Sequence, residues 1–298
     1  MAEALHMESF DGKVAIVTGG GSGMGREIVR QLAAAGCSVA ACDLNADSLA
    51  ETREMALDGA GRDVRISVHE CDVADEAAVL RFRDAALALH AVDHVDLVFA
   101  NAGLGGAGSF INDPREQWER VFAIDWWGVY YTARAFLPLL IASPSGVLVN
   151  TSSVNGFWAS LGPNFPHTAY STAKFAVKGF SESLIEDLRV NAPHVRVVLV
   201  MPGHVATDIV GNSLRAFGVT DAPAIAAANE GFRATAPMTA AEAATVILSA
   251  VRAGVWRVVV GSDGKALDEF VRAHPESAYD YAELAKHRDL PRIDVPTQ

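Results

Sequence analysis

Seven short apolar runs alternate with amphipathic segments along most of the chain. Each run is rich in Val, Ile or Ala and has the length of a buried strand. Segments such as 26–35 and 75–90 carry apolar residues at helical spacing between them. Strands joined by helices through right-handed connections predict an α/β fold, a Rossmann-like doubly wound sheet of seven parallel strands with helices on both faces. The predicted strands are residues 13–18, 38–43, 65–72, 95–100, 146–152, 195–201 and 255–261.

No linker divides the 298 residues into two units, although length alone allows one domain or two. We expect a single domain over residues 11–261, with a flexible N-terminal extension at 1–10 and a C-terminal extension at 262–298. Residues 208–237 are rich in Ala and Gly and lack a clear strand pattern. We therefore expect a mobile lid there.

The net charge of −12 and the lack of Lys or Arg clusters argue against nucleic acid and membrane surfaces as partners. No apolar run reaches the length of a membrane span, and the first residues show no targeting signal. Cys37, Cys42 and Cys71 have no metal-ligand spacing, so we expect buried, reduced thiols and no metal. These features favour a cytoplasmic protein that acts on a small molecule.

A glycine-rich turn follows the first predicted strand and leads directly into a helix. Glycines there permit a tight turn, let backbone N–H groups approach a pyrophosphate, and place it at the positive end of the helix. Such a turn by itself can merely reverse a chain, but its place between strand and helix predicts dinucleotide binding. The predicted cofactor-binding residues of the turn are Gly19, Gly21, Ser22, Gly23, Met24 and Gly25.

Asp43 ends the second predicted strand, 24 residues after Gly19. An acid at about this offset, roughly 20 residues, accepts hydrogen bonds from the adenosine ribose hydroxyls. Its carboxylate would repel a 2′-phosphate, and Ser22, Leu44 and Asn45 nearby supply no positive charge. The predicted cofactor is therefore NAD, with Asp43 and Leu44 at its adenosine end. The alternative is that Asp43 only caps the following helix.

Ser153, Tyr170 and Lys174 follow the fifth predicted strand, and Tyr170 and Lys174 stand four residues apart on one helix face. A tyrosine with its usual pKa near ~10 is a poor base at neutral pH, but a neighbouring ammonium lowers that pKa. Ser153 would hydrogen-bond a substrate oxygen and hold it near Tyr170. The three residues predict catalysis by proton transfer; the alternative is a packed tyrosine beside a solvated lysine.

With these residues placed, the chain resembles the classical short-chain dehydrogenase/reductase family over roughly residues 13–207. Each of the motifs is common alone, but their order and spacing together are specific. The motifs that carry the resemblance are 18–25, Asp72-Val73, Asn101-Ala102-Gly103, the Ser153/Tyr170/Lys174 set and Pro202-Gly203.

The resemblance implies further cofactor contacts and an assembly. Family members commonly pair through the helices that correspond to 114–143 and 167–191, which implies a homodimer or homotetramer. It assigns the catalytic serine to Ser153, although Ser152 has the same chemistry. The contacts it implies are Asp72 and Val73 with adenine, Asn101, Ala102 and Gly103 with the central strand and ribose, Pro202, Gly203, Val205 and Thr207 with nicotinamide, and Tyr170 and Lys174 with the nicotinamide ribose.

The chain departs from the family pattern in two places. Asp125 stands where the family usually has an Asn that belongs to a proton relay. It is a candidate catalytic residue through its effect on Lys174 or through its backbone, and a purely structural role is the alternative. The second departure is the C-terminal extension, which continues beyond the last predicted strand and could change the assembly.

The loop between Ser153 and Tyr170 contains three aromatic residues and two prolines. It lacks the Arg or Lys that an anionic substrate would need, so we expect it to line a pocket for an apolar or aromatic substrate. The alternative is that these aromatics only pack the loop. The predicted pocket residues are Val154, Asn155, Phe157, Trp158, Leu161 and Phe165.

Together these patterns predict an NAD-dependent oxidoreductase that interconverts a secondary alcohol and a ketone, with Tyr170 as general acid/base. The catalytic domain would be the dinucleotide-binding unit 11–261. Two alternatives stay open. One is an NADPH-dependent carbonyl reductase, opposed mainly by Asp43, and the other is a catalytically weak protein that senses NAD or scaffolds a partner.

Overall fold

The computed structural model describes residues 6–106, 108–160, 162 and 165–287, and a seven-stranded parallel sheet forms its centre. The strand order is β3-β2-β1-β4-β5-β6-β9, so the chain winds outward from β1 in two directions, as predicted for a Rossmann-like fold. All seven predicted strands are confirmed. They are β1 Val14–Thr18, β2 Ser38–Asp43, β3 Ile66–Glu70, β4 Leu97–Ala100, β5 Val147–Thr151, β6 Arg196–Pro202 and β9 Arg257–Val260.

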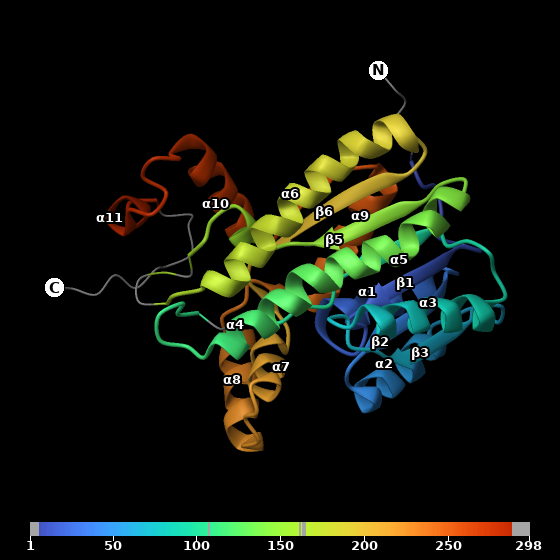
Figure 1. Ribbon diagram of the computed structural model, residues 1–298, viewed down its shortest axis with the longest axis horizontal. Helices are drawn as coiled ribbons and strands as arrows, with labels where there is room; N and C mark the ends of the chain where they lie inside the picture. The colour runs from blue at the N-terminus through green and yellow to red at the C-terminus, as the bar shows by residue number, and fades with distance from the viewer. Residues whose placement is uncertain (1–5, 107, 161, 163–164, 288–298) are drawn as a thin grey trace.

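Helices cover both faces of the sheet (Figure 1). The first predicted helix begins earlier than residue 26, at Gly23, because the glycine-rich turn runs straight into it. Residues of α1, α2 and α9 share one buried cluster with the sheet, and residues of α3, α5 and α6 share another. The bounds are α1 Gly23–Ala34, α2 Ala46–Asp58, α9 Ala240–Ala253, α3 Glu76–His90, α5 Gly128–Ala142 and α6 Thr168–Asn191.

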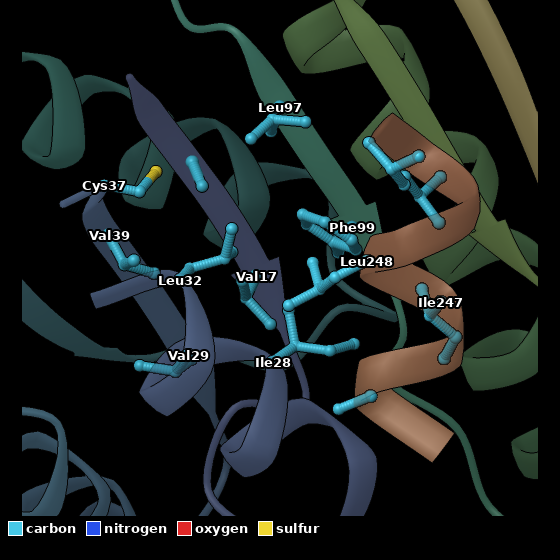
Figure 2. Packing of buried hydrophobic residues seen from close by; sticks show 14 of the residues in the cluster. Val17, Ile28, Val29, Leu32, Cys37, Val39, Leu97, Phe99, Ile247 and Leu248 are labelled. Carbon is cyan, nitrogen blue, oxygen red and sulfur yellow. The ribbon is translucent and has the colours of Figure 1, made fainter. Parts of the chain in front are cut away.

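The core between the sheet, α1 and α9 is built from aliphatic side chains (Figure 2). Ile28 and Leu32 on α1 lie beside Val17 on β1, and Ile247 approaches from α9. Central strands buried on both faces explain why their sequences are continuously apolar rather than alternating. This core fixes the strand ends that carry the candidate site.

The region 208–237 contains two helices, α7 Ile209–Ala216 and α8 Ala222–Ala234. Two short strands that pair with each other, β7 Val205–Ala206 and β8 Met238–Thr239, enclose this helix pair. This region contacts the glycine-rich turn through the Asn212 amide, which donates to Ser22 Oγ at 3.2 Å. Movement of this region as a lid stays a prediction.

The C-terminal extension forms α10 Ser262–Ala273 and the short helix α11 Tyr281–Leu284. In Figure 1 the pairs α7–α8 and α10–α11 are seen on either side of the start of α6. Within the described ranges, no helix has both the length and the apolar character needed to cross a membrane.

Phe136 on α5 is completely buried between the sheet and α3 and stacks edge-on against Phe82. Phe136→Ala is expected to lower the free energy of unfolding by about 3–5 kcal/mol, because it removes a large buried side chain and leaves a cavity. Denaturant unfolding measures this change. Phe165, which is 67% exposed, provides the matched control. A loss for Phe136→Ala no larger than that for Phe165→Ala would contradict this core.

Candidate active site

Ser153, Tyr170 and Lys174 come together where β5 ends and α6 begins. Ser153 is the second residue after β5, and α6 places Tyr170 and Lys174 one turn apart. The Lys174 ammonium nitrogen lies 5.3 Å from the centre of the Tyr170 ring. The predicted proximity of these side chains is therefore present in the folded chain.

Lys174 is a buried cation with two oxygen partners. Its side chain is 3% exposed, and its ammonium group donates to the Thr151 carbonyl at 3.2 Å. The same nitrogen lies 3.0 Å from Oδ1 of Asp125. Burial lowers the pKa of Lys174, but the Asp125 carboxylate and the Tyr170 phenol raise it, and the net pKa lies above its ordinary value. Lys174 is therefore charged at neutral pH.

Four influences act on the proton of Tyr170. Burial raises the pKa of Tyr170, Lys174 lowers it, Asp125 raises it, and a hydrogen bond with Ser153 lowers it. The net pKa lies above the ordinary tyrosine value. Lys174 lowers the pKa of Tyr170 as predicted, but burial raises that pKa by more. Tyr170 therefore carries its proton at neutral pH.

The two adjacent serines have different surroundings. The Ser152 hydroxyl donates to the Lys174 carbonyl at 2.7 Å inside the core. The Ser153 hydroxyl accepts from the Asn155 N–H at 3.1 Å and lies close enough to Tyr170 to lower the pKa of its phenol. Ser152 therefore supports the backbone of α6. Ser153 has the position required of a residue that orients a substrate oxygen.

Asp125 lies on a single π-helical turn, η1 Ala123–Trp127, that joins α4 Arg115–Phe122 to α5. Its side chain is completely buried, and neither carboxylate oxygen receives a well-aligned hydrogen bond from the described residues. Burial raises the pKa of Asp125 to about 6, although Lys174 lowers it. A Cβ atom on Gly103 would lie 2.6 Å from Oδ1, so glycine is needed there to admit the carboxylate.

The glycine-rich turn forms a tightly closed cradle at the start of α1. Gly19 has a φ of +68°, and a Cβ atom there would lie 2.8 Å from Cα of Ala102. A Cβ atom on Gly25 would lie 2.0 Å from the Gly19 carbonyl oxygen. The backbone of this turn packs too closely for side chains at Gly19 and Gly25. Such a tight glycine turn at a helix N-terminus is what a pyrophosphate site requires. The residues present fit a dinucleotide.

Asp43 faces this turn from the end of β2. Its Oδ2 accepts from the Gly21 N–H at 3.0 Å, and its Oδ1 accepts from the Asn45 N–H at 3.1 Å. The cap of α2 is Asn45, whose side chain accepts from the Ser48 N–H at 2.9 Å. The capping alternative for Asp43 is therefore wrong. Its carboxylate is held at the mouth of the turn.

Arg26 is a residue of this end that the sequence analysis missed. Its guanidinium group donates to the Gly21 carbonyl at 2.7 Å and pairs with Glu51 at 2.6 Å. Arg26 lies further along the sequence than Ser22, but the first turn of α1 brings its side chain back to the Gly21 carbonyl. A signal was available in its position three residues after Gly23. Glu51 partly neutralises this cation.

The other predicted cofactor residues lie along the same edge of the sheet. Asn101 and Ala102 donate their backbone N–H groups to Thr18 Oγ1 at 3.0 and 3.1 Å, which ties the end of β4 to the end of β1. Asp72 pairs with Arg120 at 2.9 Å, and buried Val73 packs against Gly128. Leu44 is 51% exposed beside Asp43, and Met24 packs on the core under α1.

Asp263, from the C-terminal extension, holds the predicted nicotinamide-flanking segment. Its Oδ2 accepts from the His204 N–H at 2.7 Å. A Cβ atom on Gly203 would lie 2.5 Å from the same oxygen, so glycine lets the carboxylate approach the backbone after Pro202. Val205 lies buried in β7. Thr207 approaches Gly23, where a Cβ atom would contact its methyl carbon at 3.1 Å.

The structure corrects the prediction for Trp158, because its indole is buried among apolar residues of the C-terminal extension rather than in a pocket. Its Nε1–H donates to the Ala278 carbonyl at 2.6 Å. Phe157 and Val154 pack beside it, with the Arg257 guanidinium 5.7 Å from the Phe157 ring centre. No local pattern marks this packing, because the partner residues in the C-terminal extension lie more than a hundred positions along the chain.

Asn155 also supports the loop rather than a pocket, because its amide donates to the carbonyls of Trp158 and Ser160. Leu161 lies outside the described residues. Phe165 is exposed and lines a cavity of about 770 Å³ together with His167, Phe175, Tyr279 and Tyr281. This cavity borders the site, since the His167 and Tyr170 rings lie 4.6 Å apart.

Comparison with known proteins agrees with this geometry. The family model of short chain dehydrogenases matches residues 13–216. A protein named "Putative oxidoreductase SadH" from Mycobacterium tuberculosis is 37% identical over 267 residues, which cover 89% of this chain and 92% of the relative.

Two solved structures share the fold and hold different cofactors. A short chain dehydrogenase/reductase from Burkholderia phymatum in complex with NAD superposes with a TM-score of 0.79 at 26% identity, covering 97% of this chain and 100% of that one. A metagenomic short-chain oxidoreductase in complex with NADP has a TM-score of 0.57 at 30% identity, covering 65% and 83%. On the extent of the family match and the identity with the mycobacterial relative, this chain belongs to the short-chain dehydrogenase/reductase family of oxidoreductases.

Proposed function

We propose that the chain catalyses reversible hydride transfer between NAD and a secondary alcohol/ketone pair, with Tyr170 as general acid/base. The observation that carries the proposal is the arrangement of Tyr170 between a charged, buried Lys174 and the Ser153 hydroxyl. Carbonyl reduction needs a proton donor, a nearby charge that tunes the donor's pKa, and a hydroxyl that orients the substrate oxygen. Tyr170, Lys174 and Ser153 would fill these three roles.

Each residue has a defined part in the proposed reaction. The nicotinamide cofactor accepts or supplies the hydride. Ser153 hydrogen-bonds the substrate oxygen and holds it near the Tyr170 hydroxyl. Tyr170 gives its proton to that oxygen during ketone reduction and takes it back during alcohol oxidation. Lys174 stabilises the phenolate and binds the nicotinamide ribose, while Ser152 and Thr151 hold α6 and the ammonium group in place.

The choice of NAD is supported by Asp43. Its carboxylate accepts the Gly21 N–H and stands at the mouth of the glycine-rich turn, where it would accept hydrogen bonds from ribose hydroxyls and repel a 2′-phosphate. Arg26 also lies at this turn, where it donates to the Gly21 carbonyl, and Glu51 already pairs with it. The NADPH-dependent carbonyl reductase remains the rival enzyme, because one related structure holds NADP.

An uncharged, apolar or aromatic substrate is supported by the cavity beside Tyr170. Its described lining contains Phe165, Phe175, Tyr279 and Tyr281, and no Lys, Arg, Asp or Glu is among the described residues that line it. A charged substrate would lose its hydration there without a compensating ion pair. We further propose a cytoplasmic homodimer or homotetramer, for which the exposed Trp127, directly before α5, and the exposed Phe175 on α6 provide apolar contact area.

Tyr170→Phe is expected to reduce kcat for alcohol oxidation by about 10²–10⁴-fold, because it removes the proton-carrying oxygen and leaves the ring packed against His167. NAD affinity is expected to stay within about threefold, since the phenol is not the main cofactor contact. Steady-state kinetics and cofactor titration measure the two effects. Tyr131→Phe on α5 is the matched control.

Undiminished turnover by Tyr170→Phe would overturn the mechanism. Tight NAD binding without turnover by the native chain would favour the sensing or scaffold alternative.

Asp43→Asn is expected to weaken NADH binding by about tenfold or more and to strengthen NADPH binding, because an amide keeps an acceptor for Gly21 but loses the negative charge. Fluorescence titration with both reduced cofactors measures the selectivity. Asp47→Asn, on the first turn of α2, is the control for a nearby charge outside the turn. An unchanged ratio of the two dissociation constants in Asp43→Asn would contradict the role of Asp43.

A further inference from the structure

The Lys174 ammonium has a carboxylate counter-charge inside the core. Asp125 Oδ1 lies 3.0 Å from Lys174 Nζ, and the two side chains are 0% and 3% exposed. Dissolved salt therefore screens this pair much less than it screens a surface pair. A neutral amide in place of the carboxylate would leave Lys174 as an uncompensated cation.

Tyr170 is the third member of this group. The Lys174 nitrogen lies 5.3 Å from its ring centre, and the Asp125 carboxylate acts on its proton with the opposite sign to Lys174. Among the described residues, no other titratable group exerts a resolved influence on these three side chains. The titratable side chain that packs on them is His167, whose ring lies 4.6 Å from that of Tyr170, and burial lowers the pKa of His167 to about 4, so it is uncharged at neutral and alkaline pH. The other neighbours are the Thr151 carbonyl, the Ser153 hydroxyl and the backbone at Gly103 and Leu104.

The backbone around Asp125 places its charge next to the lysine. The π-helical turn Ala123–Trp127 turns residue 125 into the core, and Gly103 leaves room for Oδ1, because a Cβ atom there would lie 2.6 Å from it. The same Cβ atom would lie 3.4 Å from Lys174 Nζ. The Lys174 ammonium lies 3.0 Å from this carboxylate, so Asp125 acts on the site through its direct ion pair with Lys174.

We propose that Asp125 is a positioning residue that neutralises Lys174 and thereby keeps Tyr170 in its protonated, proton-donating form over a wider pH range than an uncharged residue at position 125 would allow. The inference rests on the proposed proton-transfer role of Tyr170. Alcohol oxidation needs the phenolate and ketone reduction needs the phenol, so Asp125 moves the pH window of both directions upward. The proton that Tyr170 gives to the substrate oxygen is regained from water, and no further reactant is needed.

The direct test is a pH titration of tyrosinate absorbance, for which turnover is not required. Subtracting the curve of a Tyr170→Phe counterpart isolates the titration of Tyr170 in each background. Asp125→Asn keeps the shape of the side chain and removes its charge. Its Tyr170 midpoint is expected about one pH unit below that of the native chain, because a like charge near the phenolate is gone. Asp125→Ala also removes the charge and is expected to shift the midpoint in the same direction.

Asp96→Asn is the matched control, because Asp96 is likewise buried and paired with a lysine, Lys13, at 3.3 Å. It precedes β4 at the opposite end of the strand from Gly103 and is expected to leave the Tyr170 midpoint unchanged. An equal midpoint in the native chain and Asp125→Asn would overturn the inference, as would an equal shift in Asp96→Asn.

The kinetic readout separates this inference from the proposed function. The acidic limb of the pH profile of kcat/KM for alcohol oxidation is expected to move downward in Asp125→Asn by the same interval as the titration midpoint. A shifted tyrosinate titration without any turnover would uphold the charge coupling and reject the proposed function. Turnover with an unmoved acidic limb would uphold the function and reject the inference.

Discussion

The backbone of the turn after β1 approaches its neighbours more closely than side chains would allow. Gly19 and Gly25 meet within this turn, and Gly19 also meets Ala102 after β4. These contacts seat α1 against the central strands and leave its first N–H groups directed at the edge where the parallel strands end. The dinucleotide end, the Asp43 carboxylate and the neighbouring β4 motif all depend on that close approach.

The interior of the site is organised around one buried ammonium. Lys174 is held by the Thr151 carbonyl and by Asp125, and it faces the ring of Tyr170. Breaking a buried ion pair leaves an uncompensated charge, so such pairs rigidly fix the side chains that form them. The chain thus gains a well-placed lysine, but the carboxylate that holds it also opposes ionisation of Tyr170. The contact between Asp125 and Lys174 therefore affects both the position of the Lys174 ammonium and the pKa of Tyr170.

Much of the fold and part of the site could be predicted from the sequence because they depend on local patterns. Short runs rich in apolar residues marked most strands of the main sheet, and the four-residue spacing of Tyr170 and Lys174 placed both on one face of α6. The π-helical turn at Asp125 has no residue pattern of its own, and the burial of Trp158 depends on Ala278 and its neighbours far along the chain. Such long-range packing, like the approach of Asp263 to His204, leaves no periodic signal.

The measurement that tests the central claim most directly is transfer of label from secondary alcohols deuterated at the carbinol carbon, across aliphatic, aromatic and steroidal examples, with NAD and NADP in parallel. The account predicts that deuterium appears on the nicotinamide ring, with a primary isotope effect, fastest with NAD and with bulky apolar alcohols. The account would be contradicted if NAD bound saturably but no label moved from any of these alcohols to NAD, and none moved from labelled NADH to the corresponding ketones.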